Sequence, residues 1–341
     1  MTAAIGLSTY QWNNNIKSLL LLAAFPFLLL LLVGGIFFVA GLVYVQPDGV
    51  VQPQLLQGLG LETARLSPLQ LAQEGIIAYW PIVFGIAAVW MVLGYLFNGA
   101  MIRAATGAHK VERAEAPELY NLLENMCISR GMKMPELYIM ESEQLNAFAS
   151  GINESNYSIT VTRGILQRLD KDELEAVLGH ELTHILNRDV RLLIVTVVFT
   201  GMISFIAQML WRSMRYSGRS RDRKGGGTGA LMLIAAVMFA VGYLLAQLLR
   251  FAISRRREYL ADAGSVELTK NPDAMIRALQ KISGNAAMPG VPSEVQQMFI
   301  ENPPSVFSLF ATHPPIEDRI RVLRELGGLP EQGHSIIPKV G

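Results

Sequence analysis

Residues 170–186 read DKDELEAVLGHELTHIL and contain both a helix start and a pair of histidines. Asp170 is followed three positions later by Glu173, which is the pattern of a capping box at a helix N-terminus. Apolar residues then recur at helical spacing, namely Leu174, Val177, Leu178, Leu182, Ile185 and Leu186. The stretch therefore predicts a capped helix with one face in a core.

His180 and His184 stand four residues apart, so both project from one helix face and can bind one metal ion. Glu181 falls beside them, where it can take a proton from a water activated by that metal. The chain has only 5 histidines. Composition alone would produce this pattern on the order of once in a few hundred such sequences. The alternative, two histidines paired only with neighbouring polar groups, is therefore less favoured.

A catalytic zinc site needs a third protein ligand and an open position. His109 lies near a membrane end and His334 in a Gly/Pro-containing tail, so both are poor candidates. Glu258 is the better one, and Asp262 follows on the same helical face. This spacing suits a ligand carboxylate plus a carboxylate that accepts the free ring N–H of a zinc-bound histidine. The alternative is a surface carboxylate paired with the arginines before it.

The composition is typical of a membrane protein. Of 341 residues, 51% are hydrophobic and 17% charged, and the shortage of charge comes from a few long apolar runs. The net charge of +1 gives no reason to expect nucleic acid as a partner. The single cysteine, Cys127, allows no internal disulfide, and we expect it to be free and buried.

Four uncharged runs are long enough to cross a bilayer: 18–45, 75–101, 192–211 and 230–249. The first is too long for a signal-peptide core and is expected to be a retained anchor. Basic residues after the second run predict that its end faces the cytoplasm; they are Arg103, Lys110 and Arg113.

The last two runs leave two arrangements open. Six basic residues lie between Arg212 and Lys224, and two full crossings would place them outside, against the positive-inside tendency. A hairpin that re-enters the membrane or lies against the protein avoids this conflict. We expect four crossings, but either arrangement returns the chain to one side, so the histidine helix and Glu258 can meet.

These motifs resemble those of the HtpX family of integral membrane zinc metalloproteases, which is related to the CaaX prenyl proteases. The resemblance rests on residues 180–184 and 258–262 and on their position around a hydrophobic hairpin. It also includes Leu-Asn-Ala-Phe-Ala at 145–149 and Thr-His-Pro at 312–314, and runs over about residues 110–326. It implies a mainly α integral membrane protein, with transmembrane helices and a helical zincin-type domain that has a small β-sheet and one Zn²⁺ per chain.

The resemblance implies roles for further residues. Asn146 and Ala147 would lie on an edge strand that binds the backbone of an extended peptide, although Asn146 reads equally well as a turn residue. His313 would stabilise the negative oxygen of the tetrahedral intermediate, and Arg319 would assist substrate binding. The amphipathic charged stretch 317–321 gives Arg319 an equally good structural interpretation.

The implied domain organisation has four parts. A membrane region (1–103) precedes the first part of the protease domain (104–190), a hydrophobic hairpin (191–250) and the second part of the protease domain (251–341). The two protease parts together make about 175 residues, a normal size for one domain.

The resemblance implies an endopeptidase with Glu181 as general base that hydrolyses misfolded or damaged membrane proteins. It would act in the bacterial inner membrane with its protease domain in the cytoplasm; its partners would be polypeptide substrates and the lipid bilayer, without nucleic acid. The alternatives are a site-specific processing protease of the CaaX type, a non-catalytic scaffold with structural zinc, and a transport component. Glu181 argues against the scaffold, and the lack of charge within the four runs argues against transport.

Overall fold

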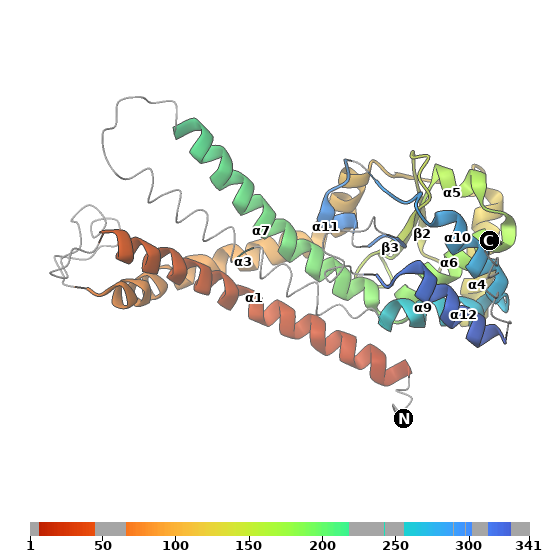
Figure 1. Cartoon of the computed structure of the whole chain (residues 1–341), viewed down its shortest axis with the longest axis horizontal. Helices are drawn as coiled ribbons and strands as arrows, with labels where there is room; N and C mark the ends of the chain where they lie inside the picture. The colour runs from red at the N-terminus through yellow and green to blue at the C-terminus, as the bar shows by residue number, and fades with distance from the viewer. Residues whose placement is uncertain are drawn as a thin grey trace, which may run out of the picture. The chain divides into compact units, whose positions relative to one another are not determined.

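The structure is a computed structural model, and it describes residues 7–44, 66–217, 256–288, 290–296, 298–301 and 313–328, together with Gly242. The basic connection after residue 217 and the fourth apolar run, Gly242 aside, lie outside the described residues. Within them the chain is mainly helical and has one small mixed sheet (Figure 1). The prediction of a mainly α chain with a small β-sheet is therefore confirmed.

The chain divides into two compact units. The first combines residues 1–15, 99–194 and 253–341, and the second combines residues 16–98 and 195–252. The first unit contains the predicted histidine helix and Glu258, which two apolar runs separate in the sequence.

The sheet of the first unit has four short strands: β1 (His109–Lys110), β2 (Glu136–Met140), β3 (Ala147–Ser150) and β4 (Ser158–Thr162). Their order is β1-β2-β4-β3, with β2 and β4 parallel and the other two pairs antiparallel. The side chains of β3 and β4 are all buried, and β4 is rich in the β-branched residues that favour strands. Because β3 comes last in this order, it lies at the edge of the sheet.

Seven of the described helices lie wholly in the first unit: α4 (Pro117–Arg130), α5 (Arg163–Arg168), α6 (Lys171–Leu186), α9 (Arg256–Thr269), α10 (Pro272–Ile282), α11 (Ser293–Gln296) and α12 (Ile316–Gly327). Helix α6 is the one predicted from residues 170–186. The predicted capping box is present, because Glu173 N donates to Asp170 Oδ1 and Asp170 N to Glu173 Oε2, both at 2.9 Å.

Helix α9 packs closely against α6. Ser265 Oγ on α9 donates to the Ala176 carbonyl oxygen on α6 at 2.6 Å. A Cβ atom on Gly264 would overlap the side chain of Thr183, so the lack of a side chain at this position permits the close approach. This approach brings the residues of the two helices together.

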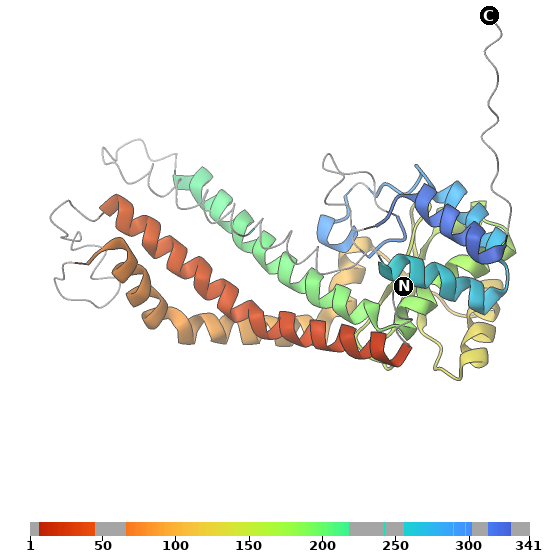
Figure 2. The same cartoon turned by 60° about the horizontal axis from the view of Figure 1, so that its bottom comes forward.

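The second unit is built from three long helices, α1 (Leu7–Tyr44), α3 (Pro68–Thr106) and α7 (Asp189–Ser217) (Figure 2). One end of each helix belongs to the first unit. Apolar side chains from all three form one cluster: Phe25, Leu29, Val83, Ala87, Val195 and Met202. In the described part of the chain, residues 18–42 of α1 and the whole of α3 are long and apolar enough to cross a membrane. The predicted run at 192–211 forms part of α7.

Candidate metal centre

Helix α6 holds His180 and His184 side by side, as their spacing predicted. Their Nε2 atoms lie 3.1 Å apart, their rings meet edge to face with centroids 4.7 Å apart, and both residues are buried. Two ring nitrogens that point at the same place can share one ion.

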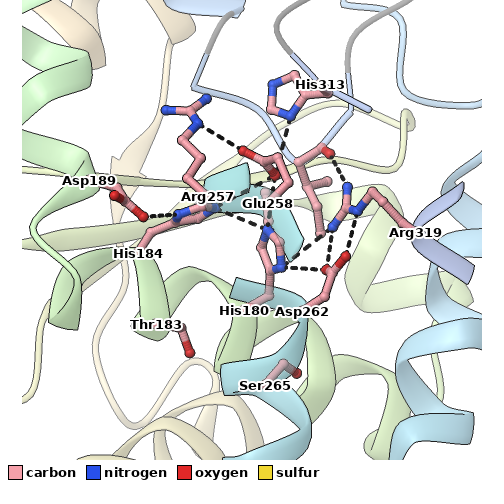
Figure 3. A network of polar contacts seen from close by, with 12 residues as sticks. His180, Thr183, His184, Asp189, Arg257, Glu258, Asp262, Ser265, His313 and Arg319 are labelled. Carbon is pink, nitrogen blue, oxygen red and sulfur yellow. Dashed lines mark hydrogen bonds and ion pairs between the residues drawn. The ribbon is translucent and has the colours of Figure 1, made fainter. Parts of the chain in front are cut away.

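Glu258 approaches this point from α9 (Figure 3). Its Oε2 atom lies 3.6 Å from Nε2 of His180 and 3.8 Å from Nε2 of His184. One potential ligand atom from each of the three residues falls within 4.8 Å of the other two. Among the described residues neither oxygen of the buried Glu258 carboxylate accepts an aligned hydrogen bond, although Arg257 Nε lies 3.0 Å from Oε1. Burial of such a carboxylate is costly without a cation, so the three residues fit a divalent metal ion.

Two carboxylates hold the far sides of the imidazole rings. Asp262 Oδ1 lies 2.9 Å from Nδ1 of His180; the sequence predicted such a contact with one of the two histidines but did not say which. Asp189 Oδ2 lies 3.0 Å from Nδ1 of His184. An Nδ1–H that donates to a carboxylate leaves the Nε2 lone pair free for an ion.

The sequence pattern did not predict the contact of Asp189 with His184. Asp189 is the first residue of α7, and the chain reaches it through Arg188, which has the left-handed backbone conformation (φ 60°) that is uncommon outside glycine. This turn directs Asp189 back to His184. The signal that could have found it is an acidic residue directly after the end of the histidine helix.

Arg319 lies behind Asp262, and all three of its nitrogens find acceptors. Nε and Nη2 donate to Asp262 Oδ2 and Oδ1 at 2.8 and 2.6 Å, and Nη1 donates to the Ile300 carbonyl oxygen at 3.0 Å. The residue is almost fully buried. Its predicted role in substrate binding stays a prediction.

Asn146 directly precedes the edge strand and Ala147 begins it. The Asn146 amide donates to the carbonyl oxygens of Ala286 and Glu301, both at 3.0 Å, and its Oδ1 accepts from the N–H groups of Ala147 and Ile300, both at 3.1 Å. The Ile300 N–H also lies 3.0 Å from the Ala147 carbonyl oxygen. The segment around Ile300 therefore already occupies the place that a peptide would take at Ala147.

Backbone groups of β3 alternate in direction along the strand. The Asn146 carbonyl oxygen accepts a hydrogen bond from Thr162 N on the β4 side. The backbone N–H and C=O groups of Ala147 and Ala149 therefore point away from β4. The outward Ala149 N–H hydrogen-bonds the Glu181 carboxylate. The edge strand thus meets the predicted general base directly.

Glu181 and His313 both face the candidate metal centre. Burial raises the pKa of Glu181, and its Oε1 has no hydrogen-bond partner among the described residues. His313 Nδ1 lies 3.3 Å from Glu258 Oε2, and burial lowers the pKa of its ring. Neither ring nitrogen of His313 has an aligned hydrogen bond in the described structure. The centre therefore has a proton acceptor and a polar ring that contacts the Glu258 carboxylate.

The charged groups of the centre stabilise one another. Burial alone would raise the pKa of Glu258, but His313, His184 and Arg257 hold it well below its ordinary value. Burial likewise opposes ionisation of Asp262, yet Arg319 and His180 keep its pKa low. For His184 burial is outweighed by Glu258 and Asp189, which raise its pKa to about 10. Both carboxylates are therefore ionised at neutral pH. Without a metal ion the proton on His184 balances this negative charge, and a metal cation bound at Nε2 would take the place of that proton.

Comparison with known proteins adds a family assignment to this geometry. The family model "Peptidase family M48" matches residues 113–327, a stretch that contains all of the residues above. A Protease HtpX homolog from Bacteroides fragilis (strain YCH46) is 43% identical over 332 residues, which cover 94% of this chain and 99% of that protein. A Protease HtpX homolog from Streptococcus equi subsp. equi is 38% identical over 255 residues, 70% of this chain and 86% of that protein. The crystal structure of S. mikatae Ste24p is similar at a TM-score of 0.46 and 16% identity; the match covers 92% of this chain and 66% of that one.

Proposed function

This chain belongs to peptidase family M48 and is a metalloprotease, and on that premise we propose that it is a zinc-dependent endopeptidase anchored in a membrane. The observation that carries the proposal is the convergence of His180, His184 and Glu258, whose ligand atoms lie within 4.8 Å of one another. Two imidazoles and one carboxylate, with a fourth position left for water, are a donor set of catalytic zinc sites.

The protein residues around the ion have distinct tasks. A Zn²⁺ ion held by His180, His184 and Glu258 would act as a Lewis acid toward the peptide carbonyl and would lower the pKa of the attacking water. Glu181 takes the proton of that water and passes it to the leaving amine, and its raised pKa makes the carboxylate a better proton acceptor. His313 donates an N–H to the negative oxygen that develops on the carbonyl carbon. Asp262 and Asp189 keep the two imidazoles in the tautomer that offers Nε2.

The proposed substrate path follows the outer edge of β3. An extended peptide can pair with the outward-facing backbone of an edge strand. At Ala149 such a peptide would lie beside Glu181, which is where hydrolysis has to occur. Binding at Asn146 and Ala147, as predicted, would continue this path, and there the peptide would replace the N–H of Ile300.

Two helices support a membrane location. Residues 18–42 and helix α3 are long and apolar enough to span a bilayer, and apolar side chains such as Leu31, Ile77 and Leu96 are exposed along them. Exposed apolar surface of this kind fits lipid better than water. We propose the bacterial inner membrane, with the protease unit on the cytoplasmic side, because basic residues follow α3. The proposed substrates are misfolded or damaged membrane proteins.

The test uses the full chain, purified in detergent and loaded with zinc, with an unfolded membrane protein as substrate. We expect cleavage at many sites, loss of cleavage with a chelator, and recovery with added zinc. Glu181→Gln should retain zinc but lose roughly two to four orders of magnitude in rate. Glu175→Gln, in the same helix and half-exposed, is the matched control.

Three results would count against the proposal. Cleavage that a chelator leaves unchanged would exclude a metal mechanism. Normal turnover by zinc-loaded Glu181→Gln would remove Glu181 as the base. Strict dependence on a prenylated C-terminus would replace the quality-control role with CaaX-type processing.

A further inference from the structure

Two arginine side chains lie buried beside the candidate metal ligands, and in the view of Figure 3 they flank Glu258. Arg319 has a relative exposure of 1% and Arg257 of 3%. Each carries a permanent positive charge, and burial of such a charge is costly unless its N–H groups find acceptors. The two arginines differ in whether their N–H groups have acceptors.

Arg319 is fully engaged within the protein. Each of its three nitrogens lies between 2.6 and 3.0 Å from an acceptor, either Asp262 or the Ile300 carbonyl oxygen. Two of these nitrogens, Nε and Nη2, hold the Asp262 carboxylate that orients His180. Every nitrogen of Arg319 thus has at least one acceptor among the described residues.

Arg257 is not engaged in this way. Its Nε lies 3.0 Å from Glu258 Oε1, so the two side chains form an ion pair. However, Nε has no aligned hydrogen bond and Nη1 has no acceptor at all within the described structure, although both atoms are buried. A buried donor left without an acceptor lowers stability, and the loss is larger on a charged group. Such a group calls for an explanation, and a bound ligand supplies one.

An oxygen acceptor that enters the centre with a ligand would supply the partner that these Arg257 nitrogens lack. The guanidinium already lies beside one carboxylate, Glu258, whose other oxygen faces His180 and His184. A second carboxylate would be repelled by Glu258, whereas a neutral carbonyl oxygen would not. The backbone of a bound peptide offers such oxygens directly next to the reacting bond.

We propose that Arg257 is a substrate-binding residue that donates hydrogen bonds to a main-chain carbonyl oxygen of the bound peptide. This inference rests on the proposed endopeptidase function. It assigns to Arg257 the substrate contact that the sequence resemblance had implied for Arg319. Arg319 then serves as a positioning residue for Asp262.

The experiment measures peptide binding rather than cleavage, in the full chain with Glu181→Gln, loaded with zinc. The probe is a short fluorescent peptide with an amidated C-terminus, taken from around a bond that the wild-type protein cleaves. Arg257→Met should weaken binding by roughly ten- to a hundredfold while zinc content stays unchanged. Arg256→Met is the matched control, because it removes the same charge from an exposed neighbouring position on α9, and its affinity should not change.

A second measurement begins with a comparison that does not depend on the folding of the variant. Peptide analogues in which one carbonyl at a time is replaced by a methylene group are bound to the protein that retains Arg257. Removal of the contacted carbonyl should weaken binding by about the same factor as Arg257→Met. For that analogue the Arg257→Met substitution should then have no further effect, which is the signature of a direct contact.

Four outcomes would overturn the inference. They are unchanged affinity in zinc-loaded Arg257→Met, a series of methylene analogues that all bind equally well, an effect confined to peptides with a free C-terminal carboxylate, and loss of zinc from Arg257→Met. The last would make Arg257 a support for Glu258 instead. If the chain with intact Arg257 shows no zinc-dependent peptide binding, the proposed function itself fails, which is a separate result.

Discussion

Asp262 and His180 face each other from α9 and α6, with Oδ1 of the carboxylate 2.9 Å from Nδ1 of the imidazole. The other side of Asp262 is held by Arg319, so the carboxylate cannot turn away. This pair fixes the ring of His180 with Nε2 directed at Glu258. The orientation of one candidate metal ligand thus depends on a carboxylate that itself touches no metal.

Asp262→Asn should therefore weaken metal binding without abolishing the site. The amide keeps the shape but is a poorer acceptor for Nδ1–H and leaves Arg319 without its charged partner. We expect zinc affinity to fall by roughly ten- to a hundredfold, measured by competition with a chromogenic chelator. Asp273→Asn, an exposed position in the first turn of α10, is the control. Equal affinity in Asp262→Asn and the unmodified protein would contradict the prediction.

Glu258→Ala should have the larger effect on the metal. Removal of one of three protein ligands leaves two histidines, which do not complete a catalytic zinc site. We expect substoichiometric zinc after dialysis, measured by elemental analysis. Glu267→Ala removes a carboxylate from the exposed face of the same helix and should retain the metal. Full zinc content and unchanged affinity in Glu258→Ala would exclude Glu258 from the ligand set.

Gly264→Ala tests the approach of α9 to α6. A glycine-to-alanine change inside a helix ordinarily stabilises it by up to about 1 kcal/mol. Here the new Cβ would overlap Thr183, so we expect a destabilisation of roughly 1–3 kcal/mol and a lower Tm. Thr183→Ala should relieve the overlap. The double variant should then lose less unfolding free energy than the two single variants lose together. If the two losses simply add, the side chains are not in direct contact.

Asn146→Ala tests how the segment around Ile300 is fastened to β3. The side chain makes four hydrogen bonds at 3.0–3.1 Å in a buried position, and its loss leaves backbone donors and acceptors without partners. We expect a loss of roughly 2–4 kcal/mol in unfolding free energy. Asn121→Ala, which is exposed and accepts one bond of 3.3 Å from Arg113, should change little. Similar thermal stability of the two variants would refute the structural role of Asn146.

Cys127 gives a prediction about pH. Burial raises the pKa of this thiol to about 12, and the carboxylate of Glu124 adds to the effect. An unfolded cysteine ionises near pH 8.5. Below that pH the thiol is protonated in both states, and above it only the unfolded chain loses the proton, so stability should fall as pH rises from about 8.5 towards 12.

Two measurements check the cysteine prediction. At pH 8 an alkylating reagent should label Cys127 only after denaturation, because the thiolate is the reactive form. Cys127→Ala should remove this thiol's contribution to the alkaline loss of stability. Rapid labelling of the folded protein would show that the thiol is neither buried nor protonated.

The local features of the candidate centre were predictable because they depend on helical periodicity. The capping box, the helix over residues 171–186 and the convergence of His180 and His184 all involve residues within one or two helical turns. Uncharged runs of sufficient length likewise predicted apolar helices, and α1 and α3 bear this out. The fourth run, apart from Gly242, lies outside the described residues.

Contacts between distant segments were less accessible. Asp262 was found because it lies one helical turn from Glu258, whereas Asp189 was missed because its position depends on the left-handed backbone at Arg188. The pairing of Ile300 with Ala147 has no signal in the sequence, because a single backbone N–H can bond to any exposed strand edge. Nor does the sequence show which buried arginine has hydrogen-bond acceptors for its side chain, because those acceptors lie on distant segments of the chain.

The sequence by itself determined which residue types are available for the centre and which helix presents the two histidines, since side chains four apart in a helix must share a face. Only the tertiary structure decided that α9 comes close enough to α6 for Glu258 to join the two histidines. The lack of a side chain at Gly264 permits this close approach. The tertiary structure also decided that the nitrogens of Arg319 have hydrogen-bond acceptors whereas Nε and Nη1 of Arg257 have none among the described residues. Such partners depend on the positions of segments far apart in the chain.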